Sequence, residues 1–156
     1  MPLQGALGWR YPHQAARPLD MLDHVLAEER ELPVVATLHP KWRYAPWERA
    51  ALRRRLAREP RLTLSEEPME RLLPRAAYVV AETSAVAFLG FFLGKPAVLF
   101  GAIDFHHIAA NVRELGVTEA FRQVRETRPD FDRYVAWFLQ DHALNTGAPD
   151  LEARIL

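Results

Sequence analysis

Carboxylate and hydroxyl side chains stand directly before the most apolar run in the chain. Glu82, Thr83 and Ser84 are followed by AVAFLGFFLG and then by KPAVLFG, which ends at Gly101. The first turn of a helix exposes unpaired N–H groups and about half a positive charge, so hydroxyls placed there would help to bind a phosphate. Serine and threonine at this position also serve as ordinary helix caps. The segment alone leaves both interpretations open.

A second polar group, His39 and Lys41 in the order HPK, follows the apolar segment PVVATL. The imidazole of His39 would donate a hydrogen bond to a phosphate or act as an acid toward a leaving group. Lys41 adds a cation that favours an anionic ligand. A histidine at the end of a strand is at least as often a structural hydrogen-bonding residue, so both roles stay open for His39.

A third polar group, Asp104, His106 and His107, follows the apolar segment AVLFG. Carboxylate and imidazole groups are common metal ligands. Adjacent histidines rarely bind one ion together, however, and no third ligand follows at a characteristic spacing. We therefore expect no metal or other cofactor, and we expect these three residues to close the mouth of a ligand crevice.

Strand-like and helix-like segments alternate along the chain and would position these groups. Apolar strands are expected at 3–7, 33–38, 61–64, 77–80 and 97–100, and helices at 17–31, 46–58, 68–73 and from the turn at 82–84 through 93. Strands that are apolar on both faces and alternate with helices are typical of a parallel sheet covered on each side. The predicted fold class is α/β: one Rossmann-like domain, with its sheet in about 1–104 and a helical tail in about 105–156.

The expected tail contains two helices, at 117–125 and 130–144, and the second has Phe131, Tyr134, Val135 and Phe138 on one face. In the sheet, ligands would bind beyond the carboxyl ends of the strands. The polar groups after the first, second, fourth and fifth expected strands would then converge on one edge.

Composition is that of an ordinary globular chain with room for one core. Of 156 residues, 49% are hydrophobic and 26% are charged. Twenty basic residues balance twenty acidic ones, so no overall field would draw the chain to nucleic acid. The arginine-rich run at 49–58 is accordingly interpreted as the solvated face of a surface helix.

The chain has no cysteine, which excludes a disulfide framework, a thiolate zinc site and a cysteine nucleophile. The longest apolar run breaks after about ten residues, short of the ~20 needed to span a bilayer. The N-terminus does not resemble a signal peptide. We therefore expect a cytoplasmic protein without a transmembrane segment.

Three ordered motifs resemble one known family. They are PLQ at 2–4, TLHPK at 37–41 and ETSAVAFLGFFLGKPAVLFG at 82–101. Together they are similar to the C-terminal half of bacterial capsule polysaccharide synthesis proteins, which resemble two-Rossmann (GT-B) glycosyltransferases, including enzymes that transfer Kdo from CMP-Kdo. The similarity extends over about 2–144.

The resemblance implies the donor-binding domain of a glycosyltransferase in capsular or surface polysaccharide biosynthesis. Its ligand would be a nucleotide sugar, with a CMP-sugar favoured over a UDP-sugar, and its acceptor a polysaccharide or glycolipid at the inner face of the membrane. In this family His39, Thr83 and Ser84 would lie near the donor phosphate, and Gln4 at the cleft. Many relatives have a Ser-Ser pair where this chain has Thr83 and Ser84, a change that keeps the hydroxyl.

His39 is the catalytic candidate, since it would stabilise the phosphate that departs from the anomeric carbon. The family supplies no role for the three residues after the last strand, which are candidates by position alone. The substrate-binding candidates are Gln4, Lys41, Glu82, Thr83, Ser84, Asp104, His106 and His107.

The length of the chain departs from the family. A two-Rossmann transferase needs a first domain for the acceptor and usually for the catalytic base. The chain would therefore be a fragment, would act with an acceptor domain from another polypeptide or as a homodimer, or would have kept binding and lost transfer. The alternative function is a non-catalytic nucleotide-binding or partner-binding assembly module. A hydrolase or epimerase ranks last, because no GxSxG motif is present.

Overall fold

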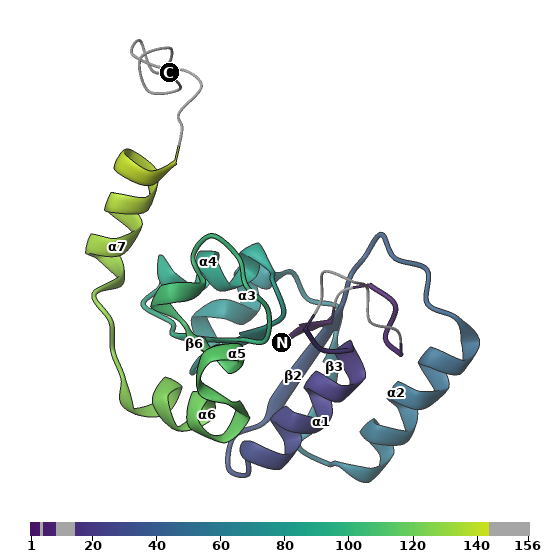
Figure 1. The fold of residues 1–156 in the computed structure, drawn as a ribbon. Coiled ribbons are helices and arrows are strands. Elements are labelled where there is room, and N and C mark those ends of the chain that lie inside the picture. Colours follow the sequence, from purple (N-terminus) through teal and green to yellow (C-terminus); the bar gives the residue numbers. More distant parts are fainter. Residues whose placement is uncertain (4, 9–14, 144–156) are drawn as a thin grey trace.

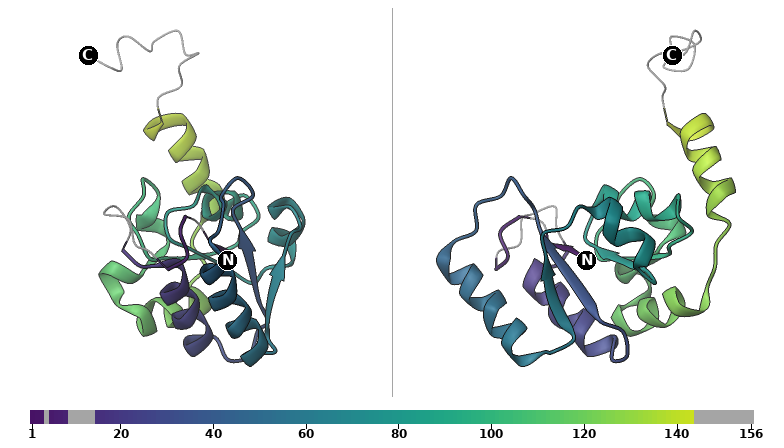
Figure 2. Two further views of the ribbon diagram at one scale, coloured as in Figure 1. Left: turned by 90° about the vertical axis from the view of Figure 1, so that its right-hand side faces the viewer. Right: turned by 180° about the vertical axis from the view of Figure 1, so that it is seen from behind.

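The computed structural model describes residues 1–3, 5–8 and 15–143 and shows an α/β fold (Figures 1 and 2). The strands are β1 (Pro2–Leu3), β2 (Val34–Leu38), β3 (Leu62–Ser65), β4 (Val79–Ala81), β5 (Ala97–Leu99) and β6 (Ala110–Asn111). The α-helices are α1 (Pro18–Glu28), α2 (Pro46–Arg58), α3 (Met69–Leu72), α4 (Ala85–Phe91), α5 (Val112–Leu115), α6 (Val117–Glu126) and α7 (Phe131–Trp137). Shorter helical turns are η1 (Leu73–Arg75), η2 (His106–Ile108) and η3 (Phe138–His142).

The strands form two parallel three-stranded sheets, ordered β1-β2-β3 and β4-β5-β6. β1 lies beside β4. The six strands therefore follow the order 3-2-1-4-5-6, which is that of doubly wound Rossmann-like folds. The predicted fold class is confirmed.

Adjacent residues of β4 and β5 point to opposite faces, and both faces are covered. Val80 and Val98 join a core with α1, α2 and α6, whereas Ala81 and Leu99 join a second core with η1, α4 and α7. All four of these side chains are buried. Burial on both sides explains why these strands read as continuous apolar runs.

The first strand is shorter than the predicted 3–7. β1 covers Pro2–Leu3 only, and Gly5 follows with a φ of 72°. A positive φ is incompatible with an extended strand and is easily adopted only by glycine. Met1 extends the pairing by donating to the Val35 carbonyl at 2.8 Å.

The sixth strand falls inside the segment predicted to be a helical tail. β6 has two residues and pairs with β5, where Asn111 lies opposite Leu99. Two residues carry no periodicity, so no sequence pattern marks them as a strand. The sheet therefore extends beyond 104, and the helical part of the tail begins at α5.

The last helix packs as predicted for one apolar face. Phe131 stacks on Phe91 of α4 with ring centroids 4.9 Å apart, and Phe138 contacts Phe88 at 4.8 Å. Tyr134 meets the edge of Phe91. From this contact α7 extends away from the sheet (Figure 1). Within the described ranges, no helix has the length and apolar character to cross a membrane.

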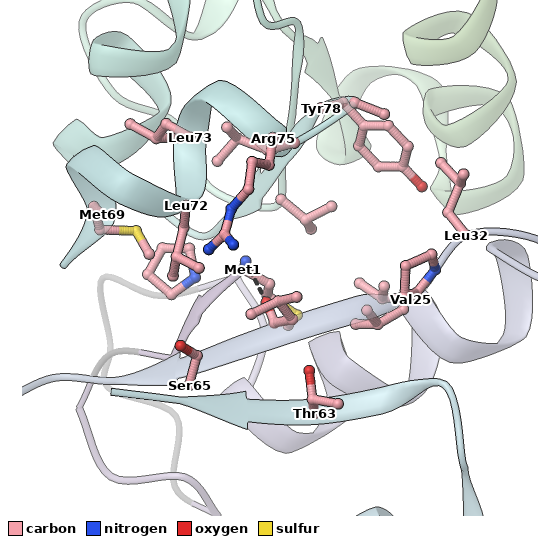
Figure 3. Close-up of a pocket in the computed structure, with 18 of the residues that line it drawn as sticks. Met1, Val25, Leu32, Thr63, Ser65, Met69, Leu72, Leu73, Arg75 and Tyr78 are labelled. Atoms are coloured by element: carbon pink, nitrogen blue, oxygen red, sulfur yellow. Dashed lines mark hydrogen bonds between the residues drawn. The ribbon is translucent and has the colours of Figure 1, made fainter. Parts of the chain in front are cut away.

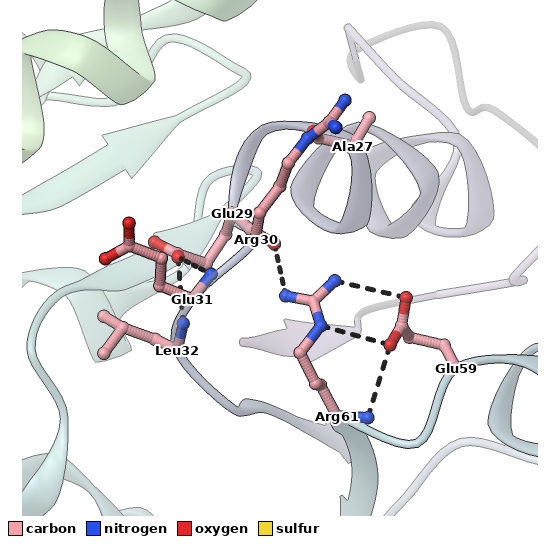
Figure 4. Close-up of polar contacts among 7 residues, drawn as sticks. All are labelled: Ala27, Glu29, Arg30, Glu31, Leu32, Glu59 and Arg61. Atoms are coloured by element: carbon pink, nitrogen blue, oxygen red, sulfur yellow. Dashed lines mark hydrogen bonds and ion pairs between the residues drawn. The ribbon is translucent and has the colours of Figure 1, made fainter.

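A buried carboxylate ends α1 three residues before the predicted helix end. Glu29 is 5% exposed, and one of its oxygens accepts from the backbone N–H groups of Glu31 and Leu32, each at 3.0 Å. Its other oxygen accepts from the Tyr78 hydroxyl at 2.6 Å. Figure 4 shows this turn and Arg61, which donates to the Glu29 carbonyl at 2.6 Å. The side chain thus replaces the next helical turn and ties α1 to the start of β4.

Burial alone would raise the pKa of Glu29, but its hydrogen bonds to Tyr78, Leu32 and Glu31 outweigh burial and lower the pKa. The folded protein therefore favours the ionised form. This contribution to stability is present above the unfolded pKa of about 4.3 and is lost as pH falls through the lower folded value.

We expect Glu29→Gln to lower the free energy of unfolding at pH 7 by about 1–2 kcal/mol, because three donors lose a charged acceptor. The deficit relative to the wild type should shrink as pH falls below about 4. Urea titrations at several pH values measure it. Glu31→Gln is the matched control, since the Glu31 side chain is exposed. A deficit that does not change with pH would contradict the role of the charge.

Candidate functional site

A hollow of about 570 Å³ lies at the carboxyl ends of β1, β2 and β3, beside the residue that precedes α4. In the strand order 3-2-1-4-5-6, the order reverses between β1 and β4, and ligands of doubly wound folds bind beside this switch point. The volume lies within the range of roughly 300–1,000 Å³ that small-molecule sites occupy. Its ionisable and hydroxyl-bearing lining residues are Thr37, His39, Tyr44, Arg49, Ser65, Glu66, Glu67 and Ser84.

His39 lines this hollow directly after β2. Its Nδ1 accepts from the Lys41 backbone N–H at 3.3 Å. In the neutral ring the proton must then lie on Nε2, because one imidazole nitrogen donates when the other accepts. The exposed ring therefore offers a donor to a ligand, and its contact with a phosphate stays a prediction. Lys41 itself is exposed, is not among the lining residues, and contributes its backbone to this turn.

Tyr44 holds the ends of β1 and β2 together beneath His39. Its hydroxyl accepts from the His39 backbone N–H at 2.8 Å and donates to the Leu3 carbonyl at 3.3 Å. Burial raises the pKa of Tyr44, and the negative charge of Glu48 raises it further. The neutral phenol needed for these two bonds is thereby favoured.

The arrangement also brings in Trp42, Arg49, Glu66 and Glu67, which the sequence analysis did not place at the site. Arg49 was grouped with the solvated arginines of its helix, but it lies on the first turn of α2, next to the hollow. Glu66 and Glu67 directly follow β3. The rule that polar residues after strands gather at one edge, applied to the third strand, would have found these two glutamates.

Glu82 has a structural role. It is 3% exposed, and its Oε1 accepts from the backbone N–H of Ala15 at 2.5 Å. Glu48 is also 3% exposed, and its Oε1 accepts from the backbone N–H of Leu7 at 2.5 Å. The two carboxylates therefore anchor the chain between β1 and α1 at two points. Neither carboxylate lines the hollow.

Thr83 packs against the glycine that ends the apolar run. A Cβ added at Gly101 would lie 2.6 Å from the Thr83 Cγ2 and 3.3 Å from the Glu82 carbonyl oxygen. The Gly101 N–H donates to that carbonyl at 3.1 Å, and the Gly101 carbonyl accepts from the Asn111 side chain at 2.9 Å. The ends of β4, β5 and β6 are thereby joined, and Thr83 contributes a methyl contact to this junction.

Ser84 is the N-cap of α4. Its hydroxyl oxygen accepts from the Val86 N–H at 3.3 Å, and the residue is 3% exposed. The helix-cap interpretation is confirmed for this residue. Ser84 borders the hollow, but its hydroxyl is engaged in the cap.

The three residues after β5 lie outside the hollow. His106 Nδ1 is 2.5 Å from the Ile103 carbonyl, and its Nε2 is 3.5 Å from Glu114. His107 packs against Tyr134 with ring centroids 5.2 Å apart. Asp104 is exposed. Burial of Tyr134, and to a smaller extent the negative charge of Asp104, raise the pKa of Tyr134 to about 12. These residues lie between β5 and β6 and contact α5 and α7, so the predicted convergence with His39 does not extend to them.

Gln4 lies outside the described residues, so its predicted place at the cleft stays a prediction. Across 1–3, 5–8 and 15–143, no group of three His, Asp or Glu side chains could hold a metal ion.

A second hollow, of about 550 Å³, is lined on one side by β2 and β3 and on the other by α3 and η1 (Figure 3). Its charged side chains are already bonded within the protein, and the Met1 ammonium donates to the Val35 carbonyl. Arg75 donates to Glu67 at 2.9 Å, and Tyr78 donates to Glu29 at 2.6 Å. The hollow beside His39 is the stronger candidate site, because it lies at the switch point and contains a free ring donor.

Comparisons of the chain with protein-family models, with curated proteins and with solved structures found no match. The resemblance to capsule polysaccharide synthesis proteins therefore stays a prediction from the three motifs.

We expect Gly101→Ala to lower the free energy of unfolding by about 1–3 kcal/mol, because the added methyl overlaps Thr83 in a packed junction. Thr83→Ser removes the overlapping Cγ2 and should restore part of this loss in the double variant. Thermal unfolding of the two single variants and the double variant measures the coupling. An equal loss from Gly101→Ala in the wild-type and Thr83→Ser backgrounds would contradict the contact.

Proposed function

We propose that the chain binds a nucleotide sugar in the hollow beside His39, as the donor-binding domain of a glycosyltransferase in capsular or surface polysaccharide biosynthesis. The observation that carries the proposal is the hollow itself, which lies at the switch point of a doubly wound sheet and is lined by His39, Arg49 and Trp42. The three sequence motifs point to the same ligand class.

The lining groups match the parts of such a ligand. His39 offers its Nε2–H, and Arg49 a guanidinium that pairs with no carboxylate in the described part of the chain. Both groups would donate to the diphosphate or monophosphate. Trp42 adds an aromatic side chain to the lining. Glu66 is an acceptor for sugar hydroxyls.

In the proposed chemistry an acceptor hydroxyl attacks the anomeric carbon and forms the new glycosidic bond, its proton passes to a base of the acceptor domain, and the nucleotide leaves with the phosphate oxygen of the broken bond. His39 and Arg49 would stabilise the negative charge on the departing phosphate by hydrogen bonds that strengthen as the glycosidic bond breaks. His39 and Arg49 thus replace Thr83 and Ser84 as the proposed phosphate contacts. Thr83 and Ser84 are used in contacts within the fold.

A second candidate is a non-catalytic nucleotide-binding module. The observation that favours it is that Glu82, Ser84, His106 and His107 are all engaged in internal contacts. This leaves catalysis in the hollow to depend on His39, the predicted catalytic residue. Such a module would bind the nucleotide without turning over the donor.

We expect CMP or UDP to stabilise the purified chain, by about 2.7 kcal/mol at a hundred times the dissociation constant. His39→Ala and Arg49→Ala should each weaken that binding by about ten- to a hundredfold, since each removes a hydrogen bond to a charged group. Calorimetric titration measures the affinities, and Arg133→Ala, an exposed arginine on α7, is the control.

Release of free sugar from a CMP-sugar or UDP-sugar, lost in His39→Ala, would support the transferase over the module. Binding without sugar release, including after addition of an acceptor domain, would support the module. Wild-type affinity in both the His39 and the Arg49 variants would contradict the proposed site.

A further inference from the structure

The loop before α2 and the outer face of α2 form a strongly basic surface on a chain that is neutral overall. The segment 41–58 contains seven of the twenty basic residues but one of the twenty acidic residues. That acidic residue, Glu48, is buried and accepts from backbone N–H groups at both of its oxygens. It therefore does not neutralise the surface.

Most of these cations have no ionic partner among the described residues. Arg55 is paired with Asp23 through two bonds of 2.6 Å. Within the described part of the chain, no carboxylate pairs with the others, which we call the arginine surface: Lys41, Arg43, Arg49, Arg53, Arg54 and Arg58. All six are exposed. Solvated helix faces usually alternate charges of both signs, and this one does not.

Two exposed tryptophans lie among these cations. Trp47 is 58% exposed and Trp42 is 39% exposed, although tryptophan is usually largely buried. A Cβ added at Gly8 would overlap the indole of Trp47, so the ring lies directly on the backbone there. The backbone supports one side of this ring, and more than half of the residue remains available to a ligand.

The arginine surface continues into the hollow beside His39. Arg49 belongs to both, and Trp42, which lies between Lys41 and Arg43 in the chain, also lines the hollow. α2 has thirteen residues and is therefore about 20 Å long. A ligand that contacts the whole surface must carry negative charges repeated over about this length, whereas a nucleotide sugar has its negative charge at its phosphates.

We infer that the arginine surface binds an acidic polysaccharide and directs it toward the hollow. Guanidinium groups bind carboxylates in a two-bond geometry, and the negative face of an indole attracts the C–H groups of a sugar ring. The choice of a polysaccharide over single-stranded nucleic acid rests on the proposed function, because the surface leads to the proposed donor site. The segment 41–58 also contains no Asn, Gln, Ser or Thr to read base edges.

The test uses polygalacturonate as the acidic polysaccharide and dextran as the neutral one, with binding measured by interferometry at several salt concentrations. We expect the wild type to bind polygalacturonate and not dextran. Arg53→Ala combined with Arg54→Ala should weaken binding about tenfold and reduce its salt dependence, because fewer counterions are released. Trp47→Ala should weaken binding without changing the salt dependence.

The matched control replaces two exposed arginines elsewhere, Arg113→Ala with Arg133→Ala on α5 and α7. If this control weakened polygalacturonate binding equally, binding would not be localised to the arginine surface, and the inference would be overturned. So would absence of binding to polygalacturonate, or tighter binding to an oligothymidylate or to phosphatidylglycerol vesicles. Nucleotide titration of the same wild-type sample separates the two proposals: polysaccharide binding without nucleotide binding contradicts the donor site, and the reverse result overturns the arginine surface.

Discussion

Two buried carboxylates attach the backbone at Leu7 and at Ala15 to the rest of the fold. Glu48 and Glu82 accept hydrogen bonds from the backbone at Leu7 and Ala15, at either end of the chain between β1 and α1. A carboxylate is costly to bury unless it is hydrogen-bonded, so each one strongly favours the arrangement that supplies its donor. β1 has only two residues and offers few sheet hydrogen bonds of its own. The carboxylates supply the attachment that a longer strand would provide.

At the edge of the sheet, the residues with structural roles and the residues available to a ligand lie after different strands. On the side of β4 and β5, Glu82, Thr83 and Ser84 are used to position a loop, a glycine and a helix. On the side of β2, Tyr44 fixes the backbone at His39 and leaves the Nε2 of the ring available. The binding capacity of the edge therefore lies with the residues after β2 and on the first turn of α2.

The distribution of charge supports one continuous functional face. In a chain that is neutral overall, α2 and the loop that precedes it contain six cations that pair with no carboxylate of the described residues, and two exposed indoles lie in the same segment. The hollow beside His39 and the arginine surface share Arg49, and Trp42 lines the hollow next to them. A small anionic ligand in the hollow and a longer anionic ligand on α2 would thus meet at the same two residues.

The sequence by itself determined the α/β class, most of the helices and strands, and the inward face of α7, because these follow from local periodicity and from apolar runs that need no knowledge of distant contacts. His39 at the end of β2 could be predicted in the same way. Only the tertiary structure decided that β6 joins the sheet, that Glu82 anchors Ala15, and that His106 and His107 pack away from the hollow. It also decided that Arg49 lines the hollow. These outcomes depend on strand order and on the direction of individual side chains, which are set by packing between segments far apart in the chain.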